Sequence, residues 1–237
     1  MIEAKCFDQK RSCSRMPRPP RPFSAKRLVL GSDPVRRAIY VVGMMPAAWA
    51  FYRGLTDQLG ADPQNVLERL LGLWALRFII LALAITPLRR LGGPNLVRYR
   101  RAVGLLAFYY AAMHVSVYLV LDKELDLWAV WADIVKRPYI TVGMLAFTIL
   151  VPLAATSNTA SIRRLGGAAW ARLHKLVYLA AAAAALHFIM LVKAWPPEPL
   201  IYAAIVAVLL GYRLVAYLMK PQRRPASGRT SPVRSVN

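Results

Sequence analysis

Six long apolar segments separated by short loops are the feature that most constrains the fold of this 237-residue chain. About 20 apolar residues, at a rise of about 1.5 Å each in a helix, are enough to cross the hydrocarbon core of a bilayer. A nucleic-acid-binding domain would explain the net charge of +21 but does not need such runs, so we expect no nucleic-acid partner. The sequence therefore predicts an all-α membrane protein with spans at 38–52, 66–87, 102–121, 139–156, 173–192 and 200–219.

Lysine and arginine are distributed unevenly between alternate loops. Residues 1–37, 88–101, 157–172 and 220–237 together hold 23 of the 32 basic residues. The intervening loops hold six basic residues together with eight acidic residues, so they carry no excess of positive charge. Because cytoplasmic loops carry the excess of basic residues, we predict a six-helix transmembrane bundle with both termini cytoplasmic.

The loops limit where chemistry can take place. The outward loops are about 5 to 17 residues long, too short for a domain, and no Gly-rich nucleotide-binding motif follows a strand. We therefore expect any chemistry to occur inside the helical bundle, with partners on either face.

Two histidines lie at nearly the same depth in the predicted third and fifth spans. His114 is about 18 Å, and His187 about 22 Å, from the cytoplasmic start of its span. Two imidazoles that face each other from neighbouring helices can hold a haem iron, with haem between the helices of the bundle. The alternative is that each fills a polar niche between helices through hydrogen bonds. The small residues around both, Ala111, Ala112 and 180–185, favour the flat cofactor.

The third histidine, His174, occupies a different level. It precedes His187 by 13 residues, which places it about 20 Å closer to the cytoplasmic face. Three roles stay open for it: the single protein ligand of a second haem, a partner for a flavin or quinone, or a histidine at the start of a helix in the membrane interface.

Arg77 lies in the middle of the second predicted span. A lone guanidinium at this depth is unfavourable by a few kcal/mol, so it should face a partner. A haem propionate and a polar residue in the bundle are equally consistent with the sequence.

Five separate stretches occur in the order TPLRR (86–90), RRAVGLLAFYYAAMH (100–114), KRPYITVG (136–143), LAATS (153–157) and RRLGGAAWARLHKLVYLAAAAAALH (163–187). In these stretches the chain resembles the MsrQ family, the haem-binding membrane subunits of bacterial periplasmic methionine-sulfoxide reductase systems. It is more distantly similar to the ferric-reductase-like transmembrane domain shared with NADPH oxidases. The resemblance covers about residues 36–219, and His114, His174 and His187 match the family's histidines one for one.

This resemblance implies one b-type haem or two, and an FMN. It implies electrons from the quinone pool or a cytosolic flavin reductase, and their delivery to a periplasmic molybdopterin methionine-sulfoxide reductase. The catalytic site would belong to that partner subunit, and this chain would be a multi-pass protein of the bacterial inner membrane. NADPH oxidases have a fourth histidine, which this chain lacks, and its absence puts the second haem in doubt. They also have a dehydrogenase domain, and its absence from this sequence agrees with the short loops.

An FMN phosphate would need basic partners on the cytoplasmic side. Arginine suits phosphate oxygens, so Arg100, Arg101, Arg163 and Arg164 are candidates, although the rule that cytoplasmic loops are basic also explains them.

The predicted organisation has three parts. Residues 1–37 form a basic, disordered tail that binds anionic membrane lipid, 38–219 form the ferric-reductase-like transmembrane haem domain, and 220–237 form a basic cytoplasmic tail. Two alternative functions remain: a quinol-oxidising cytochrome b anchor of another reductase, and a non-redox transporter or scaffold. A transporter would more often show broken helices and an internal repeat, which the sequence does not clearly show.

Overall fold

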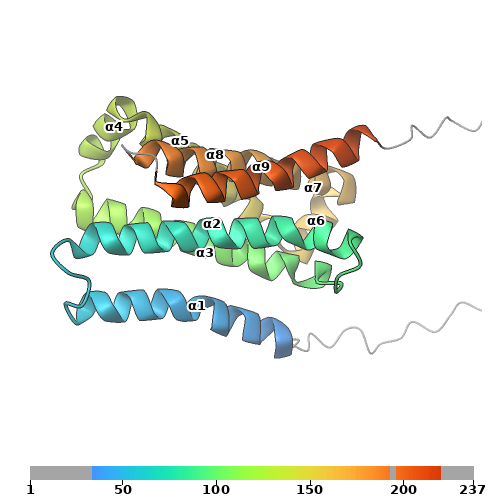
Figure 1. Cartoon of the computed structure of the whole chain (residues 1–237), viewed down its shortest axis with the longest axis horizontal. Helices are drawn as coiled ribbons and strands as arrows, with labels where there is room; N and C mark the ends of the chain where they lie inside the picture. The colour runs from blue at the N-terminus through green and yellow to red at the C-terminus, as the bar shows by residue number, and fades with distance from the viewer. Residues whose placement is uncertain (1–33, 193–195, 220–237) are drawn as a thin grey trace, which may run out of the picture. The chain divides into compact units, whose positions relative to one another are not determined.

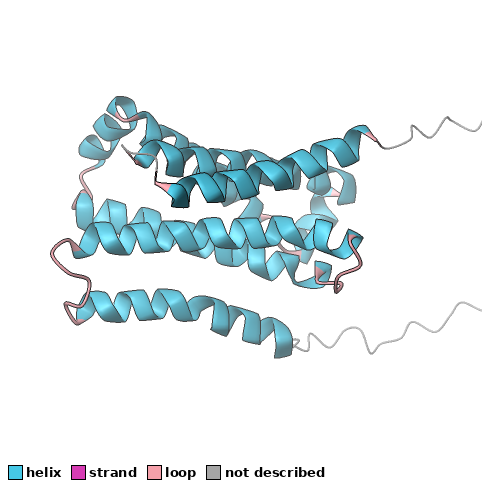
Figure 2. Cartoon of the chain, in the orientation of Figure 1, coloured by secondary structure: helices cyan, strands magenta, loops and turns pink. Residues whose placement is uncertain are grey.

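The computed structural model describes residues 34–192 and 196–219, and within them every regular element is helical (Figure 2). The predicted tails therefore lie outside the described residues, except that the first helix begins at Pro34, inside the range predicted as tail. The elements are α1 (Pro34–Leu55), α2 (Pro63–Arg90), η4 (Val97–Tyr99), α3 (Arg100–Val117), η5 (Tyr118–Asp122), α4 (Leu127–Lys136), α5 (Pro138–Ala155), α6 (Thr159–Leu165), α7 (Gly167–Leu173), η6 (His174–Leu176), α8 (Val177–Leu191) and α9 (Pro197–Leu218).

Five helical stretches are long and apolar enough to cross a membrane, and each overlaps a predicted span. The remaining predicted span coincides with α1, which has 22 residues but is less apolar than the other five. The reason is that only 15 residues separate Arg37 from Arg53. The sixth span therefore stays a prediction. The five stretches are Pro63–Arg90, Val97–Asp122, Pro138–Ala155, Gly167–Leu191 and Pro197–Leu218.

The predicted loops contain three short helices, α4, α6 and α7. Helix α4 begins at Asp126, whose carboxylate accepts hydrogen bonds from the backbone N–H groups of Trp128 and Ala129. Helix α6 begins in the same way at Asn158, whose side chain accepts from the N–H of Ser161. Short polar caps of this kind leave little trace in a hydropathy pattern.

The long helices pack side by side. Helices α2 and α3 make the most extensive contact, followed by α5 with α8 and α8 with α9 (Figure 1). In the view of Figure 1, α1 lies below α2 and α3, α4 lies at the left end of the bundle, and α6 and α7 lie at the right end. The start of α1 and the end of α9 are both at the right end. The basic loops 88–101 and 157–172 are at this end as well.

Tyr110 of α3 attaches α1 to the bundle. Its fully buried hydroxyl donates to the carbonyl of Gly43 at 2.7 Å and accepts from the N–H of Ala47 at 3.0 Å. These two backbone groups would bond to each other in a regular helix, but Pro46 disturbs α1 between them. The tyrosine hydroxyl thus bridges these two backbone groups.

We expect Tyr110→Phe to loosen α1. Two buried backbone groups would lose their partner, which should destabilise the protein by about 1–3 kcal/mol. Thermal unfolding in one detergent would measure the effect, with Tyr109→Phe, at an exposed position of the same helix, as the control. Equal unfolding temperatures for the two variants would contradict this account.

Candidate functional site

The structure brings His114 of α3 and His187 of α8 together. Their ring centroids are 6.3 Å apart, and the ring planes are inclined at 75°. The prediction that the two side chains share one depth is therefore confirmed, because rings at different levels could not approach so closely.

Backbone carbonyls hold both rings. The Nδ1 atom of His114 lies 2.9 Å from the carbonyl oxygen of Glu68, and that of His187 lies 2.6 Å from the carbonyl oxygen of Tyr139. A carbonyl oxygen can only accept, so each Nδ1 carries the proton and donates it. In the neutral imidazole this leaves the lone pair on Nε2, the nitrogen that can bind a metal. The Glu68 carboxylate is the other polar group beside His114, 3.9 Å from its Nε2.

A cavity of about 560 Å³ adjoins the two histidines, between α2, α3, α5 and α8. Its volume is in the range of roughly 300–1,000 Å³ that is usual for cofactor sites. Residues well inside the helices make an apolar wall, whereas residues near the start of α2, the end of η5 and the start of α5 make a polar rim. The apolar wall includes Leu76, Ile79, Phe147 and Leu150, and the polar rim includes Asn65, Arg69, Lys123 and Arg137.

The site fits a haem. A haem iron takes one or two axial ligands from the protein, because the porphyrin supplies the other four, and two opposed imidazoles are such a pair. The apolar wall suits the porphyrin ring, and the polar rim suits its two carboxylates.

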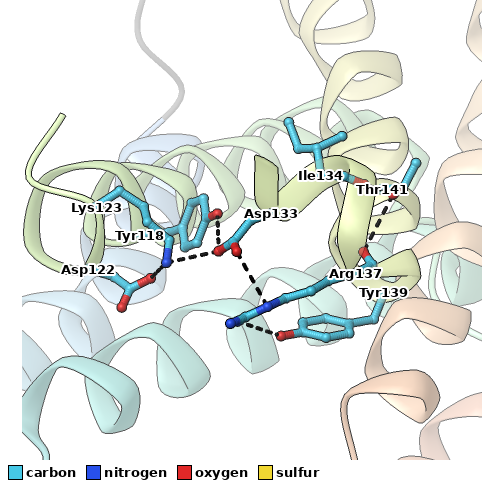
Figure 3. Close-up of polar contacts among 8 residues, drawn as sticks. All are labelled: Tyr118, Asp122, Lys123, Asp133, Ile134, Arg137, Tyr139 and Thr141. Atoms are coloured by element: carbon cyan, nitrogen blue, oxygen red, sulfur yellow. Dashed lines mark hydrogen bonds and ion pairs between the residues drawn. The ribbon is translucent and has the colours of Figure 1, made fainter. Parts of the chain in front are cut away.

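An ion-pair network lies at the rim of the cavity (Figure 3). Lys123 lies between two carboxylates, with its Nζ 2.9 Å from Asp122 and 2.8 Å from Asp133. Asp133 also accepts a hydrogen bond from the Tyr118 hydroxyl at 3.2 Å and faces Arg137 at 3.4 Å. The network joins the end of the third span to α4 and to the start of α5.

Charge pairing in this network shifts the pKa values of its members outside the spans. The hydrogen bond from Lys123 holds the pKa of Asp133 below its usual range. The same hydrogen bond, with that to Asp122, raises the pKa of Lys123. Both groups are therefore charged at neutral pH, although the side chains are only 14% and 16% exposed.

Comparison with known proteins decides the family. A family model described as "Ferric reductase like transmembrane component" matches residues 71–185. The proteins named "Protein-methionine-sulfoxide reductase heme-binding subunit MsrQ" from Brucella ovis, Brucella canis and Brucella suis are each 60% identical to this chain over 190 residues. The matched region covers 79% of this chain and 86% of each relative. The chain belongs to the MsrQ family. It is a multi-pass bacterial membrane protein.

His174 of this MsrQ-family chain is separate from the pair. It lies in the 3₁₀ turn η6, where its ring stacks on Trp170 with centroids 3.8 Å apart. Its Nδ1 faces the Trp170 carbonyl oxygen at 3.1 Å, and its Nε2 lies 3.4 Å from the Ser157 hydroxyl. His174 does not line the cavity between His114 and His187, so the roles suggested for it stay predictions.

Arg77 does not line this cavity either. Its Nε donates to the Tyr202 hydroxyl at 2.8 Å, and its guanidinium lies 4.9 Å from the centre of the Trp74 ring. Of the two partners considered for Arg77, the structure thus places it against a polar residue of the bundle.

The four arginines considered for an FMN phosphate come from two elements. Arg100 and Arg101 open α3 and lie close enough to His174 to interact with it electrostatically. Arg163 and Arg164 are exposed in the last turn of α6. Helix α6 and the start of α3 lie at the same end of the bundle, opposite α4 (Figure 1).

The sequence reading missed the acceptors of the two histidines and the rim network. The acceptors are backbone carbonyls, which every residue has, so no side chain marks them. The charged residues of the rim are visible in the sequence. Their pairing, however, depends on how α4 packs against its neighbours in the bundle.

Proposed function

We propose that this chain is the transmembrane electron-transfer subunit of a periplasmic methionine-sulfoxide reductase system. Electrons would enter at the cytoplasmic end from the quinone pool or a cytosolic flavin reductase. They would leave at the outer end to a molybdopterin-containing catalytic subunit that repairs oxidised periplasmic proteins. The membrane would be the bacterial inner membrane, with α1 as the sixth span and both termini cytoplasmic.

The opposed pair of histidines is the observation that carries this proposal. A b-type haem held there would supply a reversible one-electron carrier inside the bundle. His114 and His187 present unprotonated Nε2 atoms for it, and their Nδ1–H groups are tied to the backbone. The residues of the apolar wall would surround the porphyrin ring.

The rim offers partners for the haem carboxylates. Lys123 and Arg137 are cations at the mouth of the cavity, and both are joined to Asp133. Arg69 also lines the mouth and pairs with Glu198 at 3.6 Å. We assign the carboxylates of the porphyrin to this cationic side, which orients the group with its polar edge outward.

We also propose an FMN at the cytoplasmic end, with its phosphate near Arg100, Arg101, Arg163 and Arg164. In support of this, every Asp and Glu in the described parts of the chain belongs to an outer loop or an outer helix end, so these arginines have no carboxylate in their own loops. A phosphate would neutralise part of this charge. Arg100 and Arg101 lie within electrostatic range of His174, which would be near the flavin or quinol that delivers electrons.

A reduced-minus-oxidised visible spectrum of the purified chain, with the haem-to-protein ratio, tests the proposal directly. We expect the spectrum of a low-spin b-type haem. We also expect no reduction by NADH or NADPH alone, because this sequence shows no Gly-rich nucleotide-binding motif after a strand. We expect rapid reduction when a flavin reductase or a quinol is added. A haem-free protein, or direct reduction by a pyridine nucleotide, would contradict the proposal.

A further inference from the structure

Each of the two facing histidines packs against a glycine of the neighbouring helix. His114 of α3 lies against Gly72 of α2, and His187 of α8 lies against Gly143 of α5. Each glycine stands four residues, about one helical turn, after the residue whose carbonyl accepts the Nδ1–H. The two histidine sites thus share one arrangement of imidazole, carbonyl and glycine, although they come from different helix pairs.

A side chain at either glycine would collide with the imidazole. A Cβ at position 143 would lie 2.7 Å from Nδ1 of His187 and 2.9 Å from its Cε1. A Cβ at position 72 would lie 3.1 Å from Nδ1 of His114. Since real Cβ atoms essentially never come closer than about 3.0 Å, alanine at 143 would force the ring to move. Alanine at 72 would make a tight contact with the His114 ring without forcing it to move far.

Helix geometry explains why a glycine is needed at this position. The carbonyl of residue i already accepts the N–H of residue i+4, which here is the glycine itself. Its second lone pair is free but lies beside the side chain of residue i+4. Without a Cβ at that position, an imidazole can approach the helix and donate to the carbonyl.

We propose that Gly72 and Gly143 are positioning residues for the two axial histidines. They open the carbonyls of Glu68 and Tyr139 to Nδ1–H, which sets the tautomer that leaves Nε2 bare and fixes the angle between the rings. This inference rests on the proposed haem ligation by His114 and His187.

Other glycines of the bundle supply matched controls. Gly104 in α3 and Gly211 in α9 have no neighbouring atom within 4 Å of a built Cβ. Replacing them with alanine should only favour the helix. The helix-forming gain is the same at positions 72 and 143, so any loss there must come from the histidine contact.

The test compares Gly143→Ala and Gly72→Ala with Gly104→Ala and Gly211→Ala. Haem affinity of the purified chain should fall about 10–100-fold in Gly143→Ala, as is usual when the group that orients a ligating histidine is disturbed. The haem affinity of Gly72→Ala should fall less. Electron paramagnetic resonance of the oxidised haem, which reports the angle between the imidazole planes, should change in both variants and in neither control.

Two further measurements separate the possible failures. The unfolding temperature of the haem-free chain should not fall in Gly72→Ala, because its contact is mild and alanine favours the helix. If Gly143→Ala does not fold, Gly72→Ala decides: an unchanged resonance spectrum and haem affinity there would overturn the inference. The inference would also be overturned if Gly143→Ala had the same haem affinity and resonance spectrum as Gly104→Ala. If His114→Ala and His187→Ala keep low-spin haem, the proposed ligation itself is wrong.

Discussion

His114→Ala or His187→Ala should remove most of the bound haem and abolish the proposed electron transfer. Each change deletes one of the two imidazoles whose ring centroids lie 6.3 Å apart, and with it one unprotonated Nε2. The remaining histidine could hold at most a five-coordinate iron, which is no longer low-spin. The haem-to-protein ratio and the visible spectrum, measured for each variant in the same detergent, report both losses.

His174→Ala is the control for these two variants. His174 does not line the cavity, and its ring contacts Trp170 and Ser157 instead. We therefore expect the low-spin spectrum to persist in this variant while stopped-flow reduction from the cytoplasmic side slows. If His114→Ala keeps full low-spin haem and His174→Ala loses it, then His174 holds the iron, and the assignment of the facing pair fails.

Lys123→Met should destabilise the end of the bundle at which α4 lies. Lys123 neutralises Asp122 and Asp133, and its removal leaves two carboxylates without their shared cation. Breaking a fully buried ion pair costs about 3–5 kcal/mol; we expect about 2–3 kcal/mol here, because Arg137 still faces Asp133 and water reaches the rim. Thermal unfolding of the haem-free chain measures this loss.

Lys136→Met tests whether loss of a lysine charge alone has this effect. Lys136 is exposed at the end of α4, and within residues 34–192 and 196–219 it has no ion pair. Its removal should leave the unfolding temperature nearly unchanged. Similar losses in both variants would mean that the network contributes little.

The same network predicts how stability depends on pH. Asp133 has a lowered pKa in the folded protein, so its contribution is present above its unfolded pKa of about 4 and is lost as the pH falls through the lower folded value. Lys123 has a raised pKa, so its contribution is present below its unfolded pKa of about 10 and is lost only above the folded value. Asp133→Asn should remove the acid-side dependence that this residue causes.

The membrane spans could be predicted from the sequence because the physical cause is local. A helix in lipid must be apolar over about 20 residues, and a hydropathy pattern records that requirement directly. Five of the predicted spans have helices of sufficient length and apolarity. For α1 the 15 residues between its flanking arginines are too few for the pattern to decide.

The pairing of His114 with His187 could be predicted for a similar reason. The rise per residue of an α-helix is constant, so counting residues from the ends of two spans gives the relative depth of two side chains. The depth says nothing about rotation around each helix axis. That the rings face each other was decided by how α3 and α8 pack in the bundle.

Only the tertiary structure decided how these histidines are held and what surrounds them. The carbonyls of Glu68 and Tyr139 accept hydrogen bonds from the rings because α2 and α5 pack against them. Gly72 and Gly143 contact the histidines through the same packing. These contacts join residues 46 and 48 positions apart in the chain. Apolar length and helical rise act within one segment and can be read from the sequence. Hydrogen bonds between helices depend on packing angles that no single segment specifies.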